Sequence, residues 1–213
     1  IVHISMVRDF VRVGDVVLFK SSTTASALQR AVTLSEFDHV AIVCETIPGV
    51  PQLLEATGDG VQTYPLVARL RAYMQEFAKH VAIRRFIGDS DRDAATEAIN
   101  DFVRGVEGSE YSIAIHKFLH VGSQSTSPVD EEMDSKQKWF CSEVVAAALQ
   151  HAGFLDYGSA KRNSSFWPRS FCPGGLVEKY VCEGWMLDEL TMIDSRVVEL
   201  VGARTASTRR LQI

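Results

Sequence analysis

A cysteine stands where the sequence predicts that a helix begins. The motif Trp139-Phe140-Cys141-Ser142-Glu143 leads directly into an apolar run over residues 144–149. A thiol in the first turn of a helix lies near the positive end of the helix dipole, and that field favours the thiolate. Because the thiolate is the nucleophilic form, Cys141 is the candidate nucleophile of a thiol enzyme. The alternative is a buried structural cysteine, since free cysteine is among the most buried residue types.

A histidine and a glutamate upstream have the chemistry to activate such a thiol. His39 opens the apolar run Val40-Ala41-Ile42-Val43, which predicts a short strand. Glu55 follows 16 residues later (55 − 39), inside a second apolar run, at a distance that suits a hairpin with the two positions side by side. A glutamate beside an imidazole fixes its tautomer and stabilises the imidazolium. Taken singly, His39 also fits a core histidine and Glu55 a surface carboxylate.

The order and spacing of these motifs resemble the circularly permuted, papain-like cysteine hydrolases of the NlpC superfamily, in its YiiX-like and lecithin:retinol-acyltransferase-like branches. The matching segments, spread over residues 14–175, are Gly14-Asp15-Val16-Val17-Leu18-Phe19, Phe37-Asp38-His39, the apolar-Glu-Ala segment ending in Gly60-Val61, and Phe140-Cys141-Ser142-Glu143. The resemblance implies that Cys141 is the nucleophile, His39 the base and Glu55 the orienting residue. The asparagine-cysteine and histidine-phenylalanine signatures of the acyltransferases themselves are not found, which favours the YiiX-like side.

The pattern of elements predicts an α+β fold. Strands are expected near residues 15–19, 40–44, 52–56 and 81–87, with a closing strand over residues 185–194. Helices are expected over residues 65–78, from residue 90 to about residue 105, and from residue 141 to about residue 151. Strands and helices interleave without regular alternation, which is typical of α+β proteins. The resemblance adds a permuted papain-like arrangement, with an antiparallel, partly barrelled sheet and helices packed on one side.

Length and composition fit one enzyme-sized domain. With 213 residues, 46% of them hydrophobic and 23% charged, we expect a single domain over residues 1–213. Its papain-like core is expected over about residues 14–194, with a frayed tail over about residues 203–213. The net charge of −5 suggests no basic surface for nucleic acid, so no nucleic-acid partner is expected.

No apolar run reaches the roughly 18 residues of a membrane span, so no transmembrane segment is expected, and no signal peptide is visible. The chain begins at Ile1 rather than methionine, which fits a piece of a longer protein.

The remaining cysteines and histidines suggest no second site. The chain has four cysteines, Cys44, Cys141, Cys172 and Cys182. They form no C-x-x-C pair, which argues against a zinc ribbon, and a reducing cytosol is the default location. Cys172 and Cys182 would pair only in an oxidising compartment. His116 and His120 would share a helix face and are the rival constellation, a zinc site. No glutamate follows His116 as in a metalloprotease helix, so neither a metal nor a cofactor is expected.

The chemistry implied by the resemblance is acyl transfer through a thioester on Cys141. A cysteine amidase or peptidase acting on small amides or peptides is the leading expectation. The alternatives are a lipid-directed acyltransferase, phospholipase or thioesterase of the same fold, and a binding domain without turnover. The backbone N–H of Cys141 is the natural oxyanion donor. Tyr111, Trp139 and Trp167 are predicted by position to line the cleft, although each also fits ordinary packing. Residues 121–137 predict a polar surface loop or flap.

Overall fold

Seven strands form one mixed sheet, and two more form a separate ribbon. The computed structural model describes residues 1–22, 35–88, 91–111, 139–158 and 163–194. The strands are β1 (Val2–His3), β2 (Val16–Ser21), β3 (His39–Ile47), β4 (Val50–Thr57), β5 (Gly60–Pro65), β6 (Ala78–Arg84), β7 (Phe86–Gly88), β8 (Trp185–Leu187) and β9 (Thr191–Asp194). Their order in the large sheet is β1-β9-β6-β2-β3-β4-β5, while β7 pairs with β8.

Four α-helices and several short helical turns surround the described part of the sheet. The α-helices are α1 (Val7–Phe10), α3 (Leu66–Ala72), α4 (Arg92–Val106) and α6 (Cys141–His151). The shorter turns are η1 (Ile4–Met6), the π-helical turn η2 (Tyr73–Phe77), η3 (Asn163–Ser165), η4 (Pro168–Phe171) and η5 (Leu176–Tyr180). Within these residues, none of the helices combines the length and the apolar character needed to cross a membrane.

Two tight turns build the half of the sheet that carries the site. The chain turns from β3 into β4 after Ile47 and from β4 into β5 after Thr57, so these three strands pair antiparallel. Strand β2 lies antiparallel between β3 and β6, whereas β1 runs parallel to β9. The predicted α+β class is confirmed. The sheet is open rather than partly barrelled in the described residues, because its edge strands β1 and β5 do not pair with each other.

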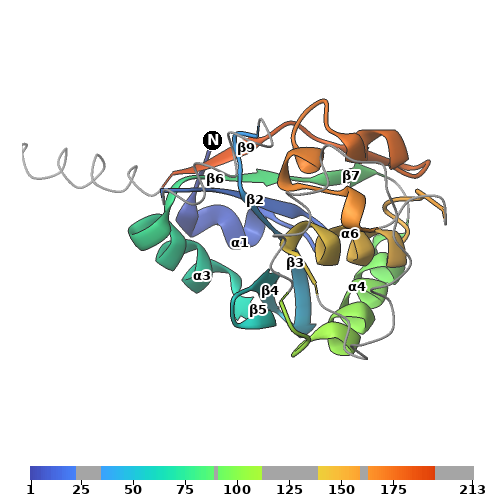
Figure 1. Ribbon diagram of the computed structural model, residues 1–213, viewed down its shortest axis with the longest axis horizontal. Coiled ribbons are helices and arrows are strands. Elements are labelled where there is room, and N and C mark those ends of the chain that lie inside the picture. Colours follow the sequence, from blue (N-terminus) through green and yellow to red (C-terminus); the bar gives the residue numbers. More distant parts are fainter. Residues whose placement is uncertain (23–34, 89–90, 112–138, 159–162, 195–213) are drawn as a thin grey trace, which may run out of the picture.

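Alternate side chains of the central strands enter two separate cores. Val16 and Leu18 of β2 point to the face covered by α4 and α6, and Val17 and Phe19 point to the face covered by α1 and α3. Figure 1 shows α1 and α3 on one side of β3, with α4 and α6 on the other. The expectation of helices on one side is therefore corrected. Strands β2 and β3 are continuous apolar runs, and burying both of their faces requires helices on both sides.

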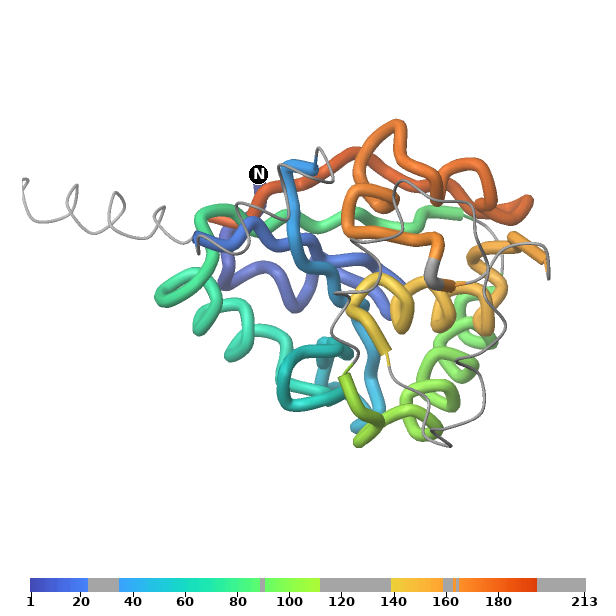
Figure 2. The backbone as a smooth tube through the Cα atoms, in the orientation of Figure 1, coloured from blue at the N-terminus to red at the C-terminus, as the bar shows by residue number. Residues whose placement is uncertain are grey.

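The two ends of the described chain meet in the sheet. Val2 of β1 lies opposite Ile193 of β9, and Figure 2 shows the blue N-terminal end beside the red strand. Residues 185–194, predicted as one closing strand, form two strands instead. The first, β8, pairs with β7, and the second, β9, pairs with β6. Between them the N–H of Asp188 donates to the carbonyl oxygen of Arg85 at 2.9 Å, where the chain passes from one sheet to the other.

Gly60, at the start of β5, fixes the sheet to the segment that leads to Tyr111. Its φ is +95°, and a Cβ there would lie 2.7 Å from the carbonyl oxygen of Ser109, which accepts the N–H of Val61. We expect Gly60→Ala to lower the free energy of unfolding by about 2 kcal/mol, because it adds a clash to a left-handed backbone conformation. Urea unfolding followed by circular dichroism measures the change.

Gly58→Ala is the matched control for this variant. Gly58 lies in the same turn, but a Cβ there would meet nothing within 4 Å, so its stability is expected to stay close to that of the wild type. Equal stability of the two variants would show that the contact at Ser109 is not tight.

Candidate active site

The β3–β4 hairpin brings His39 and Glu55 together. The register pairs Ile42 with Leu54, which places His39 diagonal to Glu55 on the face covered by α3. The Nε2 atom of His39 donates a hydrogen bond to Oε2 of Glu55 at 2.8 Å. The side chain of Glu55 is fully buried, and that of His39 is 15% exposed. The imidazole is therefore held from inside the protein and keeps a small exposed fraction.

Three donors surround the buried carboxylate of Glu55. Besides His39, the Tyr73 hydroxyl donates to Oε2 at 2.8 Å, and the Arg69 Nε–H donates to Oε1. Burial alone would raise the pKa of Glu55. The hydrogen bond and charge of His39, the charge of Arg69 and the hydrogen bond of Tyr73 outweigh burial and lower the pKa below its ordinary value. Glu55 is thus held as a carboxylate.

Cys141 is the first residue of α6, a helix buried on all sides. Its residues 141–149 are all buried, and apart from Ser142 and Glu143 they are apolar, as expected for a helix packed on every side. The helix start is fixed by Glu143, whose Oε2 accepts the backbone N–H of Phe140 at 2.9 Å, and by Ser142, whose hydroxyl donates to the carbonyl of Phe166 at 2.5 Å. The N–H of Cys141 itself forms no hydrogen bond within the described residues. Among the described residues it has no acceptor, and it lies in the first turn, beside the sulfur.

His39 is held between two acids. It hydrogen-bonds both Cys141 and Glu55, and because Glu55 accepts from Nε2, the nitrogen left for the sulfur is Nδ1. Burial alone would lower the pKa of His39. The hydrogen bonds with Cys141 and Glu55, and the negative charges of both, raise that pKa to about 10. At neutral pH this geometry favours an imidazolium, the partner that a thiolate needs.

The site lies where the two cores meet, at the first residue of β3. Cys141 belongs to the core under α4 and α6, and α6 packs against β3 and β4. The His39 ring lies 5.5 Å from the ring of Phe19 and 6.0 Å from that of Tyr73, on the opposite face. Contact between His39 and Cys141 therefore joins the two sides of the sheet.

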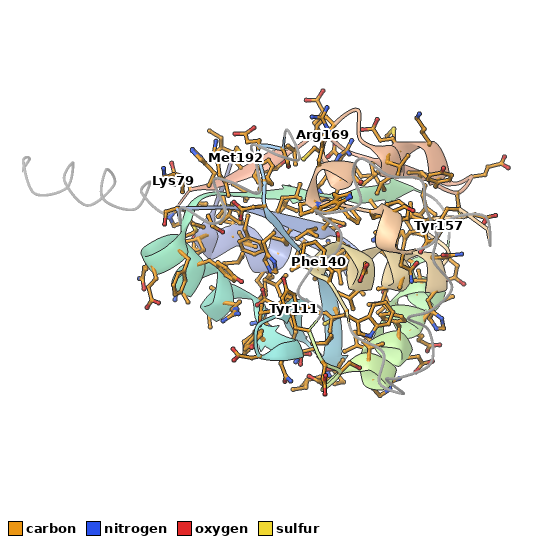
Figure 3. All side chains as sticks on the ribbon, in the orientation of Figure 1. Lys79, Tyr111, Phe140, Tyr157, Arg169 and Met192 are labelled. Carbon is orange, nitrogen blue, oxygen red and sulfur yellow. The ribbon has the colours of Figure 1, made fainter. Side chains whose placement is uncertain are left out.

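The three predicted cleft residues all lie near the start of α6 but differ in exposure. Tyr111 forms a β-bridge with Trp139, and its ring lies 6.1 Å from that of Phe140 (Figure 3). Trp139 is 5% exposed and packs edge-on against an aromatic ring of α4, so it is largely a core residue. Trp167 is half-buried, with its ring 6.0 Å from that of Phe140. Of these three, Tyr111 interacts with Cys141: burial, followed by the charge of Cys141, raises the pKa of the Tyr111 hydroxyl.

Sequence reasoning missed Arg69 and Tyr73. Both lie beyond Pro65, and their spacing of four residues places them on one helical face, which turns toward Glu55. That spacing was the available signal. Arg71, two residues after Arg69, is exposed. The two arginines lie on the same helix, but only Arg69 faces Glu55. A sequence with two arginines in one short helix does not say which of them meets the buried acid.

The other three cysteines are free thiols in different surroundings. Cys44 is buried, and burial raises its pKa to about 12. Burial also raises the pKa of Cys172 to about 11 and that of Cys182 above its ordinary value. These thiols stay protonated at neutral pH and provide a baseline against which an activated Cys141 can be compared.

The rival metal constellation falls outside the described residues. His116 and His120, and the predicted flap over residues 121–137, belong to the segment between Tyr111 and Trp139 that the structure does not describe. In the parts of the chain that it does describe, no three His, Cys, Asp or Glu side chains gather so as to hold a metal ion.

Comparisons with known proteins show the fold. No family model matches the chain, and no curated protein matches its sequence. The crystal structure of the metalloprotein YiiX from Escherichia coli O157:H7, assigned to DUF1105, is similar over 86% of this chain and 97% of that chain. The TM-score is 0.50 and the sequence identity 15%, so the likeness concerns the fold. It confirms the expectation drawn from the sequence: this chain has a YiiX-like fold.

Proposed function

We propose that the protein is a cysteine hydrolase that cleaves amide or peptide bonds through a thioester on Cys141. The observation that carries this proposal is the position of His39, which contacts the candidate nucleophile with one ring nitrogen and a buried carboxylate with the other. Nucleophile, base and orienting acid in one hydrogen-bonded row is the arrangement that activates nucleophiles in hydrolases. The YiiX-like fold, which resembles papain-like enzymes, agrees with it.

The reaction divides into two steps. The Cys141 thiolate attacks the carbonyl carbon, the C–N bond breaks, and His39 gives its proton to the departing amine. The acyl group now sits on sulfur as a thioester, and His39 is neutral. His39 then takes a proton from water as the water oxygen attacks the thioester, and the C–S bond breaks to release the acid and restore the ion pair.

Two donors support the oxyanion in this proposal. The first is the backbone N–H of Cys141, which is unpaired among the described residues and lies beside the sulfur. The second is the hydroxyl of Tyr111. Burial, followed by the charges of Cys141 and Glu143, raises the pKa of Tyr111, so its phenol keeps the proton it would donate. The same residue was predicted to line the cleft, and this role would place it against the scissile carbonyl.

The described residues do not fit a resident metal ion. YiiX is described as a metalloprotein, but here the lone pairs of Glu55 already accept from His39, Tyr73 and Arg69. A guanidinium paired with Glu55 also places a positive charge where a metal cation would have to bind. No step of the proposed mechanism involves a metal.

The direct test is the alkylation rate of each cysteine by iodoacetamide from pH 4 to pH 9, followed by peptide mass spectrometry. Cys141 is expected to react well below about pH 8.5, the pKa of an ordinary thiol, and at least tenfold faster at pH 6 than any other cysteine. In His39→Ala this reactivity at low pH is expected to disappear, because the thiolate loses its counter-ion.

His80→Ala is the matched control, since His80 is exposed on β6 and far from the proposed row in sequence and contact. A Cys141 no more reactive than Cys44, Cys172 and Cys182 would end the hydrolase proposal and leave a binding domain. Panels of dipeptide amides and of phospholipids, analysed by mass spectrometry, then identify the acyl donor. Hydrolysis of lipid alone would replace the amidase by a lipid-directed enzyme.

A further inference from the structure

We infer that Arg69 is a positioning residue of the active site, a fourth member of the row formed by Cys141, His39 and Glu55. This inference rests on the proposed function and deepens it. Its role is to neutralise Glu55, so that the thiolate–imidazolium pair persists in acid. Neither the sequence motifs nor the fold likeness assigns any role to this residue.

The geometry shows that Arg69 is built into place. Its Nε–H donates to Oε1 of Glu55, the oxygen that His39 does not use. The guanidinium carbon lies 3.9 Å from the ring centre of Tyr64 and 4.9 Å from that of Tyr73, so aromatic rings from β5 and η2 both contact the cation. A surface arginine held only by a carboxylate would be free to swing away. Here two rings and a buried acid fix its position.

Tyr73 holds the other oxygen of the same carboxylate. Its hydroxyl donates to Oε2 at 2.8 Å, beside the hydrogen bond from His39, and its ring lies 4.3 Å from that of Phe19. Tyr73 opens the π-helical turn that follows α3, an irregularity often found at functional sites. Together, Arg69 and Tyr73 prevent rotation of the carboxylate, which would break its bond to His39.

The charges along the row alternate. In the active form they are thiolate, imidazolium, carboxylate and guanidinium, with a sum of zero. The groups that face Glu55 from the surrounding elements are His39 on β3, Arg69 on α3 and Tyr73 on η2, and Cys141 of α6 lies beyond His39. Gln62, opposite Glu55 on β5, carries no charge. Among the residues that the structure describes, Arg69 therefore supplies the permanent positive charge in contact with Glu55, since His39 gives up its proton during the reaction.

Removing Arg69 has a predictable sign. Without the guanidinium, the buried row of thiolate, imidazolium and carboxylate has a net charge of −1, and a buried net negative charge takes up a proton more readily. The proton goes to the thiolate. The acidic limb, the part of the pH profile where the rate of Cys141 alkylation falls as the pH decreases, therefore moves to higher pH. A shift of about one pH unit corresponds to about a tenfold slower alkylation on that limb.

The experiment is the pH profile of Cys141 alkylation in Arg69→Met, Arg69→Lys and Tyr73→Phe. Arg69→Met is expected to move the acidic limb upward by about one unit. Arg69→Lys keeps the charge, so its acidic limb is expected to stay close to the wild-type position. Tyr73→Phe keeps all charges but removes one donor from Glu55, and a shift of a few tenths of a unit is expected.

Arg71→Met is the matched control. It makes the same substitution on the same helix, but Arg71 is exposed, so the limb is expected to stay in place. Thermal unfolding of each variant checks that the protein remains folded, and Arg69→Gln, which also removes the charge, replaces Arg69→Met if the latter does not fold. A limb that stays at its wild-type position in the folded variant without the charge, Arg69→Met or Arg69→Gln, would overturn the inference.

The outcomes separate the inference from the function it rests on. If wild-type Cys141 reacts at low pH, and this reactivity is lost in the His39 variant but unchanged in the Arg69 variants, the hydrolase proposal stands and the role proposed for Arg69 is wrong. If wild-type Cys141 has no reactivity at low pH, the hydrolase proposal and the inference both fall.

Discussion

Cys141→Ser is expected to lower turnover by more than about a thousandfold. The hydroxyl of serine is a far weaker acid than a thiol, and the surroundings of residue 141 are built to hold an anion beside an imidazolium rather than to remove a proton from an alcohol. The substitution replaces one atom in a fully packed position, so the fold is expected to survive. The measurement is kcat with the amide substrate found in the panel, together with a search for the acyl-enzyme by intact-protein mass spectrometry.

Cys172→Ser is the matched control for this loss. Cys172 is a half-buried thiol whose pKa burial raises to about 11, so it should contribute nothing to turnover. Activity that survives in Cys141→Ser, or that disappears equally in Cys172→Ser, would remove Cys141 from the mechanism.

Glu55→Gln is expected to lower kcat by about a hundredfold or more and to destabilise the fold by about 3 kcal/mol. A carboxylate accepts from His39, Tyr73 and Arg69 at once, whereas an amide accepts with one atom and donates with the other. The imidazolium and the guanidinium would then share a site with no negative charge between them. His39 would lose both its orientation and the charge that helps to raise its pKa.

Two measurements separate the catalytic from the structural effect of this change. Activity is assayed well below the unfolding temperature, and the pH profile of Cys141 alkylation is compared with that of the wild type. Glu76→Gln, at an exposed position of η2, is the control. A Glu55→Gln protein that is merely less stable, with an unchanged profile, would reduce Glu55 to a structural acid.

Local signals in the sequence predicted the parts of the fold that depend on neighbouring residues. The Pro48-Gly49 turn joins β3 to β4, and α6 runs from Cys141 to a stop at Gly153, whose φ is +73°. Such elements follow from turn chemistry and apolar runs a few residues long. The spacing of His39 and Glu55 predicted that their side chains lie side by side for the same reason, because one short hairpin fixes their relative positions.

Contacts between distant segments could not be predicted in this way. The cover on the second face of the sheet comes from α1 and α3, and an apolar strand does not reveal which helices will pack on it. The chain passes between two sheets near Asp188, inside a run that looks like one strand. Arg69 pairs with Glu55 through a tertiary contact, and a local pattern on a helix does not identify the strand residue that the helix will face.

The meeting of two cores at His39 has a consequence for the folding chain itself. The sulfur of Cys141 is carried by one layer, and the imidazole that activates it is held by the other. In the proposed enzyme, a nascent or partly unfolded molecule in which only one layer has formed carries Cys141 as a thiol of ordinary, low reactivity. The thiol of Cys141 then becomes reactive only when both layers have packed together, so immature or damaged molecules carry no activated thiolate.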